Sequence, residues 1–212
     1  MKKTIIALII FSFLSCKAQI PMIERYGSSS YGTIENAYYK DLQNFHDQYV
    51  GTWLYTNGAT SLKVVLIKKP MFHVLGGPKT FYEDLLIGEY QYIENGVEKV
   101  NTLNNLSINN TEISDYNLYS ITQIRKSAYP KCPECGADEK RLMMNLNEPS
   151  RRYIVNGISN EFDLRKLIEN GVEKLKVQFV YTGMGGNYSI TGEKVYVTNY
   201  SLPYGDYTLI KQ

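Results

Sequence analysis

Apolar and polar residues alternate with a period of two through most of this chain after residue 50. Within residues 61–68, Leu62, Val64 and Leu66 share one face of an extended segment. The other face is also largely apolar, so we expect this strand to be covered on both sides. Residues 174–181 alternate more cleanly, which indicates a strand with one dry and one mostly wet face.

The heptapeptide Ile-Glu-Asn-Gly-Val-Glu-Lys occurs twice, at residues 93–99 and 168–174. An Asn-Gly pair between two extended runs is a strong hairpin signal, because both residues accept the positive φ of a type I′ turn. The repeat therefore predicts two hairpins, with Asn95-Gly96 and Asn170-Gly171 at their tips. The alternative for the second copy is a short helix over residues 162–169 that ends at a glycine cap.

The remaining pattern predicts an all-β fold. A short N-terminal helix is expected within residues 36–49, where Tyr39, Leu42 and Phe45 recur at three-residue steps. With about eight to ten short strands and no long amphipathic helix, the chain should form an antiparallel up-and-down barrel, with a β-sandwich as the alternative. The further strands are expected at residues 97–106, 112–124, 141–146, 153–155, 188–200 and 206–210.

The N-terminus reads as an export signal. Lys2 and Lys3 precede an apolar run of about ten residues, which is too short to span a bilayer. The run ends at Ser15-Cys16, which resembles the lipobox of bacterial lipoproteins. We therefore expect a signal peptide at 1–15, a lipidated Cys16 with a flexible tether at 16–36, and a single β domain at 37–212.

This reading places the protein in the bacterial cell envelope, attached to the outer membrane through its N-terminal lipid. The alternative is cleavage before Gln19 by the ordinary signal peptidase, which would release a soluble secreted or periplasmic protein. Removal of 1–15 takes two of the 23 basic residues, so 21 basic residues face 21 acidic ones. A balanced chain gives no electrostatic reason to expect a nucleic-acid partner.

Two further cysteines, Cys132 and Cys135, lie in a Cys-Pro-Glu-Cys stretch. The spacing resembles half of a zinc knuckle, but the second half is absent and His46 and His73 are distant in sequence. In an exported protein this pair is more typical of a local loop disulfide. We expect a disulfide and no metal site.

No motif in the chain predicts a reaction. There is no Gly-x-Ser-x-Gly elbow, no His-Glu-x-x-His pair and no phosphate-binding glycine loop ahead of a helix. Only two histidines are available for acid-base chemistry. The sequence predicts no catalytic residues, no cofactor and no enzyme activity.

Gly51-Thr52-Trp53 at the start of the first strand resembles the entry motif of lipocalins and other calycins, in which the Trp closes one end of the barrel. Residues 50–58 and 81–92 together also resemble an uncharacterised family of small exported Gram-negative lipoproteins. That family carries no established activity or site residues. The lipocalin resemblance implies an up-and-down barrel that encloses a small ligand.

Two binding functions follow from these observations. The first is a small apolar or amphipathic ligand inside a lipocalin-like barrel, contacted by Trp53, Tyr90 and Tyr92. The second is a module without an internal pocket that binds an envelope protein or a glycan through exposed tyrosines. Tyr90 and Tyr92 share one strand face, which should point inward in the first case and outward in the second.

Overall fold

The computed structural model describes residues 19–149, 160–181, 187–188, 194–195 and 200–212. Within them the chain forms a closed, antiparallel, eight-stranded barrel. The strands follow one another around the barrel in chain order, and the last pairs with the first, so the topology is up-and-down and the barrel replaces the alternative sandwich. The barrel strands are β3 (Gly51–Asn57), β4 (Thr60–Val74), β5 (Phe81–Glu94), β7 (Leu118–Arg125), β8 (Lys140–Leu146), β9 (Asn160–Glu169), β10 (Val172–Tyr181) and β13 (Gly205–Lys211).

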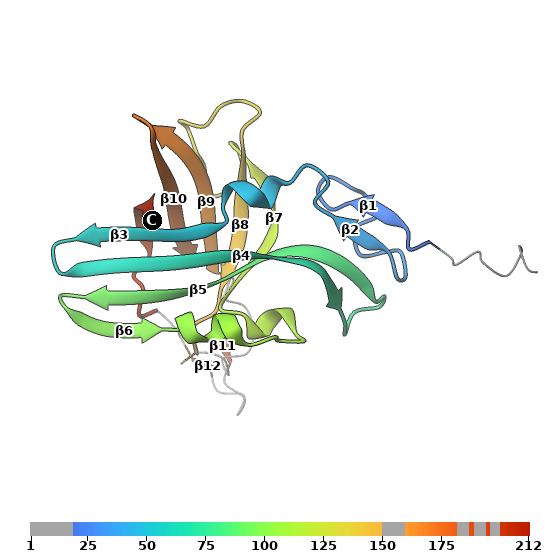
Figure 1. Cartoon of the computed structure of the whole chain (residues 1–212), viewed down its shortest axis with the longest axis horizontal. Helices are drawn as coiled ribbons and strands as arrows, with labels where there is room; N and C mark the ends of the chain where they lie inside the picture. The colour runs from blue at the N-terminus through green and yellow to red at the C-terminus, as the bar shows by residue number, and fades with distance from the viewer. Residues whose placement is uncertain (1–18, 150–159, 182–186, 189–193, 196–199) are drawn as a thin grey trace, which may run out of the picture.

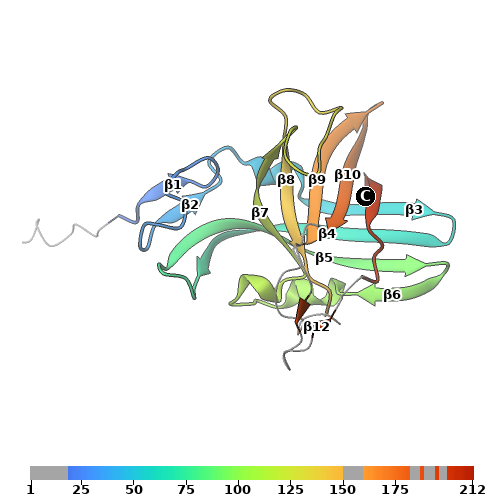
Figure 2. The ribbon, with the colours of Figure 1, turned by 180° about the vertical axis from the view of Figure 1, so that it is seen from behind.

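Shorter elements surround the barrel. In Figure 1, β3, β4 and β5 cross the strands β7 to β10 at a steep angle, and β1 and β2 form a small lobe at one side. Figure 2 shows the same lobe from behind, beside the curved ends of β4 and β5. The short strands are β1 (Met22–Glu24), β2 (Tyr38–Lys40), β6 (Val97–Asn101), β11 (Asn187–Tyr188) and β12 (Lys194–Val195), and the 3-10 turns are η2 (Phe45–Gln48), η3 (Leu103–Ser107) and η4 (Ile113–Asp115).

Both predicted hairpins are confirmed. Glu94 pairs with Val97 and Glu169 pairs with Val172, which leaves Asn95-Gly96 and Asn170-Gly171 as two-residue loops. All four loop residues have positive φ, as a type I′ turn requires. The alternative helix over residues 162–169 is therefore wrong, because this segment is β9.

The predicted N-terminal helix over residues 36–49 is wrong. The segment contains β2 and only the four-residue turn η2. The Asp41 side chain accepts hydrogen bonds from the backbone N–H groups of Phe45 and His46, and Asn44 has a φ of 52°. A residue in the left-handed region cannot continue a right-handed helix, so the residues before Asn44 and the turn after it do not join into one helix.

Part of the segment predicted as a flexible tether is instead ordered against the barrel. Met22–Glu24 forms β1, which pairs in parallel with β2, and β2 pairs with β5. The next residue, Arg25, is buried and forms an ion pair with Glu83 of β5 at 2.8 Å. Single charged residues among serines and glycines carry no periodic signal, so this docking was not visible in the sequence.

Two strand boundaries differ from the prediction. The strand expected at 97–106 ends at Asn101, and the strand expected at 112–124 begins only at Leu118 after the turn η4. The strand expected at 153–155 and much of that at 188–200 lie outside the described residues. The predicted cover on both faces of residues 61–68 is also wrong, because Ile67 on the second face is 36% exposed.

Proline explains the bend in β4. Register shifts between Lys69 and Phe72, and Met71 has a φ of 52°. Pro70 lies within this bulge, where its missing N–H removes a ladder hydrogen bond. Beyond the bulge, the end of β4 lies on the same side of the barrel as the β1–β2 lobe (Figure 1).

The main core fills the described part of the barrel interior. Its members are the alternate, inward residues of the barrel strands, as the period of two requires. These side chains pack against one another at or below 3% exposure, and they include Trp53, Leu62, Val64, Leu66, Leu86, Tyr90, Tyr92, Leu142, Met144, Phe162, Leu164, Leu175, Val177, Phe179 and Leu209.

Candidate functional site

The three residues predicted to contact an internal ligand lie together in this core. Tyr90 and Tyr92 point inward from β5 and are at most 3% exposed, and Trp53 from β3 is fully buried. The Trp53 indole N–H donates to the carbonyl oxygen of Tyr49 at 2.8 Å. All three side chains are therefore packed against protein atoms.

Two lysines close the barrel over Trp53. The ammonium groups of Lys166 and Lys211 each lie 5.5 Å from the centre of the indole ring, at cation–π distance. Both lysines also bind the carboxylate of Glu173. Lys211 lies near the end of the chain and pairs with Trp53 in the register of β13 and β3.

The two histidines do not meet. His46 is fully buried, with Nε2 2.5 Å from the Tyr26 hydroxyl and Nδ1 3.8 Å from Asp41. Burial, assisted by the charge of Arg25, lowers the pKa of His46 to about 3. His73 instead stacks on Tyr82. Among the described residues, no group of three or more His, Cys, Asp or Glu is placed to hold a metal ion.

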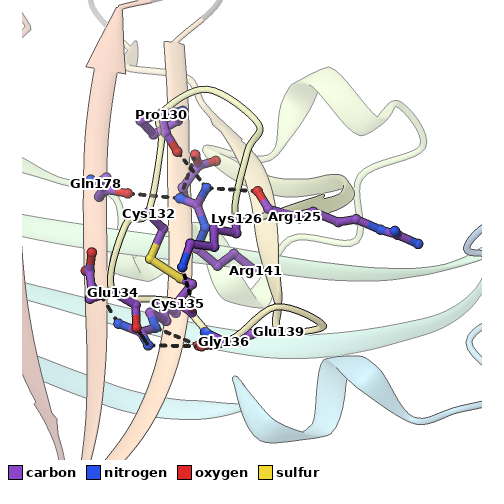
Figure 3. The surroundings of a disulfide bond; sticks show 12 residues. Arg125, Lys126, Pro130, Cys132, Glu134, Cys135, Gly136, Glu139, Arg141 and Gln178 are labelled. Atoms are coloured by element: carbon purple, nitrogen blue, oxygen red, sulfur yellow. Dashed lines mark hydrogen bonds and ion pairs between the residues drawn. A yellow bond between two sulfur atoms is a disulfide. The ribbon is translucent and has the colours of Figure 1, made fainter.

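Cys16 lies outside the described residues, whereas the other two cysteines belong to the loop that joins β7 to β8. Their sulfur atoms are bonded, with the Cα atoms 5.3 Å apart. The Lys126 ammonium donates to the carbonyl oxygen of Cys135. The disulfide is therefore part of a compact loop that lies against the outer wall of the barrel (Figure 3).

Arg141 of β8 fastens this loop to the wall. Its side chain is only 2% exposed. The guanidinium donates to the carbonyl oxygen of Pro130 at 2.6 Å and to that of Arg125 at 3.4 Å, and to the side chain of Gln178 at 2.9 Å (Figure 3). A planar group with several donors suits a loop that offers several carbonyl oxygens.

A second arginine fixes the other side of the loop. Arg165 of β9 donates two hydrogen bonds to the Glu139 carboxylate, at 2.6 and 3.0 Å. It also contacts the Glu134 side chain at 3.4 Å. Each arginine thus has its charge directed mainly toward the loop.

Between this loop and the outer wall lies a pocket of about 170 Å³. Residues 132 and 134 contribute to its cover, and outward residues of β8, β9, β10 and β13 form its floor. We call it the loop pocket. A second hollow of about 470 Å³ is wider and lies between Glu94, Lys99 and residues 200–204.

Asp163 of the loop pocket is a buried carboxylate without a hydrogen-bond partner among the described residues. Its side chain has no solvent exposure, yet neither carboxylate oxygen has a hydrogen-bond partner among the described residues. The nearest cation is Arg141, whose Nη1 is 3.8 Å away, beyond hydrogen-bonding distance. Burial, followed by the charge of Glu161, raises the pKa of Asp163 to about 8, while Arg141 opposes the shift.

The charged residues on the pocket floor form two rows. The strand register places the members of each row side by side on β9, β10 and β13, and the two rows are two residues apart along each strand. The first row is acidic or neutral, and the second is basic or neutral. The first consists of Asp163, Gln178 and Asp206, and the second of Arg165, Lys176 and Thr208.

Sequence reasoning did not identify this pocket. Asp163 alternates with Phe162 and Leu164, so it resembles an ordinary residue on the wet face of a strand. Its cover comes from a loop some thirty residues earlier in the chain. The only available signal was the Cys-x-x-Cys pair, which indicated a constrained loop but not what the loop covers.

Fold and pocket together define the class of protein: a small, closed, up-and-down β-barrel with a disulfide loop over a polar pocket on its outer wall. The chain belongs to a family of unknown function (DUF6705), whose sequence profile matches residues 1–212. No curated protein and no solved structure matches it. Among the described residues, no helix has the length and apolar character needed to cross a bilayer.

Proposed function

We propose that this protein is a lipid-anchored component of the bacterial cell envelope that binds a small polar ligand in the loop pocket without transforming it. The observation that carries the proposal is Asp163, a carboxylate that is fully buried beside a cavity and has no described hydrogen-bond partner. Such a group is costly to bury. A ligand that donates hydrogen bonds to it would remove that cost.

The packing favours the outer wall over the barrel interior as the binding site. Inward residues such as Trp53, Tyr90 and Leu164 are buried against one another. The loop pocket, in contrast, combines open volume with charged side chains.

Native mass spectrometry of the mature protein, purified from its own cells in detergent, tests the proposal. We expect a small molecule to remain bound to the wild-type protein and to the Asp138→Asn variant, because Asp138 is an exposed residue of the same loop. We expect Asp163→Asn to lose it. Equal retention by Asp163→Asn, or no bound molecule in any of the three proteins, would contradict this function.

Membrane attachment through Cys16 is a separate part of the proposal. Its support is the short apolar run that ends at Ser15-Cys16. Replacement of Cys16 by Ser should move the protein from the membrane fraction to the soluble fraction. Unchanged membrane fractionation of the Cys16→Ser variant would argue against lipid anchoring.

A lipocalin-like barrel that holds an apolar ligand is the second candidate. It is supported by the up-and-down strand order and by Trp53 at an end of the barrel covered by Lys211. Trp53 is the single tryptophan of the chain, so its fluorescence reports on the interior alone. Saturable quenching by a fatty acid would favour this candidate, and unchanged emission would exclude it.

A further inference from the structure

We propose that the ligand of the loop pocket is a small zwitterion of the free amino-acid class, with its ammonium group on Asp163 and its carboxylate on Lys176. This inference rests on the proposed function, since it names the ligand class of the same site. It follows from three properties of the pocket: an acidic group without donors, a basic group without acceptors, and a small volume.

The ammonium end is assigned by Asp163. Both of its oxygens need donors, and a protonated amine offers three N–H groups from a single compact atom. Arg141 does not supply these hydrogen bonds, because its Nη groups donate to Pro130, Arg125 and Gln178, and Nη1 lies 3.8 Å from Asp163 Oδ2. A ligand ammonium would place a positive charge beside the buried carboxylate, which is the most effective compensation for its burial.

The carboxylate end is assigned by Lys176. This residue is half-buried and lines the pocket, and its ammonium forms no hydrogen bond or ion pair among the described residues. The other cation of the same row, Arg165, is already bound to Glu139 and Glu134. Lys176 is therefore the cation available to a ligand.

The strand register sets the separation of the two backbone positions that carry these side chains. Asp163 is opposite Gln178, and Lys176 is two residues from Gln178 on the same strand face. Diagonal neighbours of this kind on antiparallel strands lie roughly 7–8 Å apart. Side chains that start this close together on one strand face can both reach a ligand whose ammonium and carboxylate are separated by one or a few bonds.

The volume limits the ligand to a small molecule. A cavity of about 150 Å³ holds benzene, so the 170 Å³ of the loop pocket suits a molecule of comparable size. Drug-sized ligands occupy pockets of about 300 Å³ or more. A free amino acid fits this limit, whereas a lipid or a folded peptide does not.

A thermal-shift screen of the mature protein with each of the standard L-amino acids tests the inference. The amino acid that stabilises most is then compared with two relatives: the amine that lacks its carboxylate and the acid that lacks its ammonium. We expect the intact amino acid to bind at least about ten-fold more tightly than either relative, because each relative loses one charged hydrogen-bonded end.

Variants of Asp163 and Lys176 test which residue binds the ammonium and which binds the carboxylate of the ligand. Asp163→Asn and Lys176→Gln should each weaken the amino acid by about ten-fold or more, while Asp138→Asn should bind as the wild type does. Circular dichroism confirms that the variants are folded. An amine that binds as tightly as the amino acid, with no effect of Lys176→Gln, would overturn the zwitterion but leave the proposed function standing.

A screen with no response to any amino acid would also overturn the zwitterion. The proposed function would survive that result if mass spectrometry detects another bound molecule. The two experiments together therefore distinguish failure of the zwitterion inference from failure of the proposed function.

Discussion

Among the described glycines, Gly88 is the one at which an added Cβ atom would be most crowded. It pairs with Leu66 on β4 and with Leu118 on β7, where the sheet closes. A Cβ atom at this position would lie 2.5 Å from Leu66 Cδ2 and 2.7 Å from the Val65 carbonyl oxygen. Only glycine allows the strands to approach this closely.

We therefore expect Gly88→Ala to lower the free energy of unfolding by about 1–3 kcal/mol, as overpacking does. Urea unfolding measures the change. Gly136→Ala is the matched control, because its Cβ would meet its nearest atom, Glu139 Cβ, at an ordinary 3.6 Å. Equal stability of Gly88→Ala and wild type would show that β4 and β5 are not packed as described.

Glu89, the residue after Gly88, makes the stability of the fold depend on pH. It is fully buried, its Oε2 has no hydrogen-bond partner among the described residues, and Oε1 accepts a long bond of 3.4 Å from the Asn117 backbone. Burial raises its pKa to about 7, and hydrogen bonds from the Thr102 side chain and the Asn117 backbone oppose the shift. Since the unfolded chain ionises at lower pH than the folded one, stability should be full below the unfolded pKa and fall as pH rises through about 7.

Glu89→Gln removes this contribution. The variant should gain on the order of 2 kcal/mol relative to wild type between about pH 4 and pH 8. Urea unfolding of both proteins at the two pH values isolates the effect, because all other titrating groups are shared. A difference between the proteins that does not change with pH would refute the role of Glu89.

At the scale of elements, the β9–β10 hairpin depends on Gly171, whose φ is 76°. A β-branched residue resists this conformation. Gly171→Val should destabilise the protein by about 1 kcal/mol or more, and Gly171→Asn by clearly less, because Asn tolerates positive φ. Chemical denaturation ranks the three proteins, and equal stability of the Val and Asn variants would contradict the turn assignment.

Elements with a local cause could be predicted from the sequence. Local sequence patterns predict the two Asn-Gly turns and the strands that contain the alternating runs 61–66 and 174–181. The helix predicted over 36–49 failed because three-residue spacing of apolar side chains was outweighed by a single residue, Asn44, whose left-handed backbone separates β2 from the four-residue turn η2.

At the scale of the whole molecule, the barrel followed from the sequence because short connections between consecutive strands leave few topologies. The loop pocket did not follow. Asp163 acquires its burial from the β7–β8 loop, and that loop is held by Arg141 through carbonyl oxygens that leave no sequence signature. A site formed by tertiary contact between a loop and a wet strand face has no periodic pattern to reveal it.

The most direct test of the binding site is the titration of the Asp163 carboxyl carbon by ¹³C NMR, with the signal assigned by its loss in Asp163→Asn. Without ligand, the midpoint should lie near pH 8, because burial and the charge of Glu161 outweigh Arg141. Saturation with the most stabilising amino acid should lower it by about one unit for each ten-fold preference for the ionised carboxylate. A midpoint that does not move on saturation, or one near the ordinary value of an aspartate in the free protein, would contradict this account.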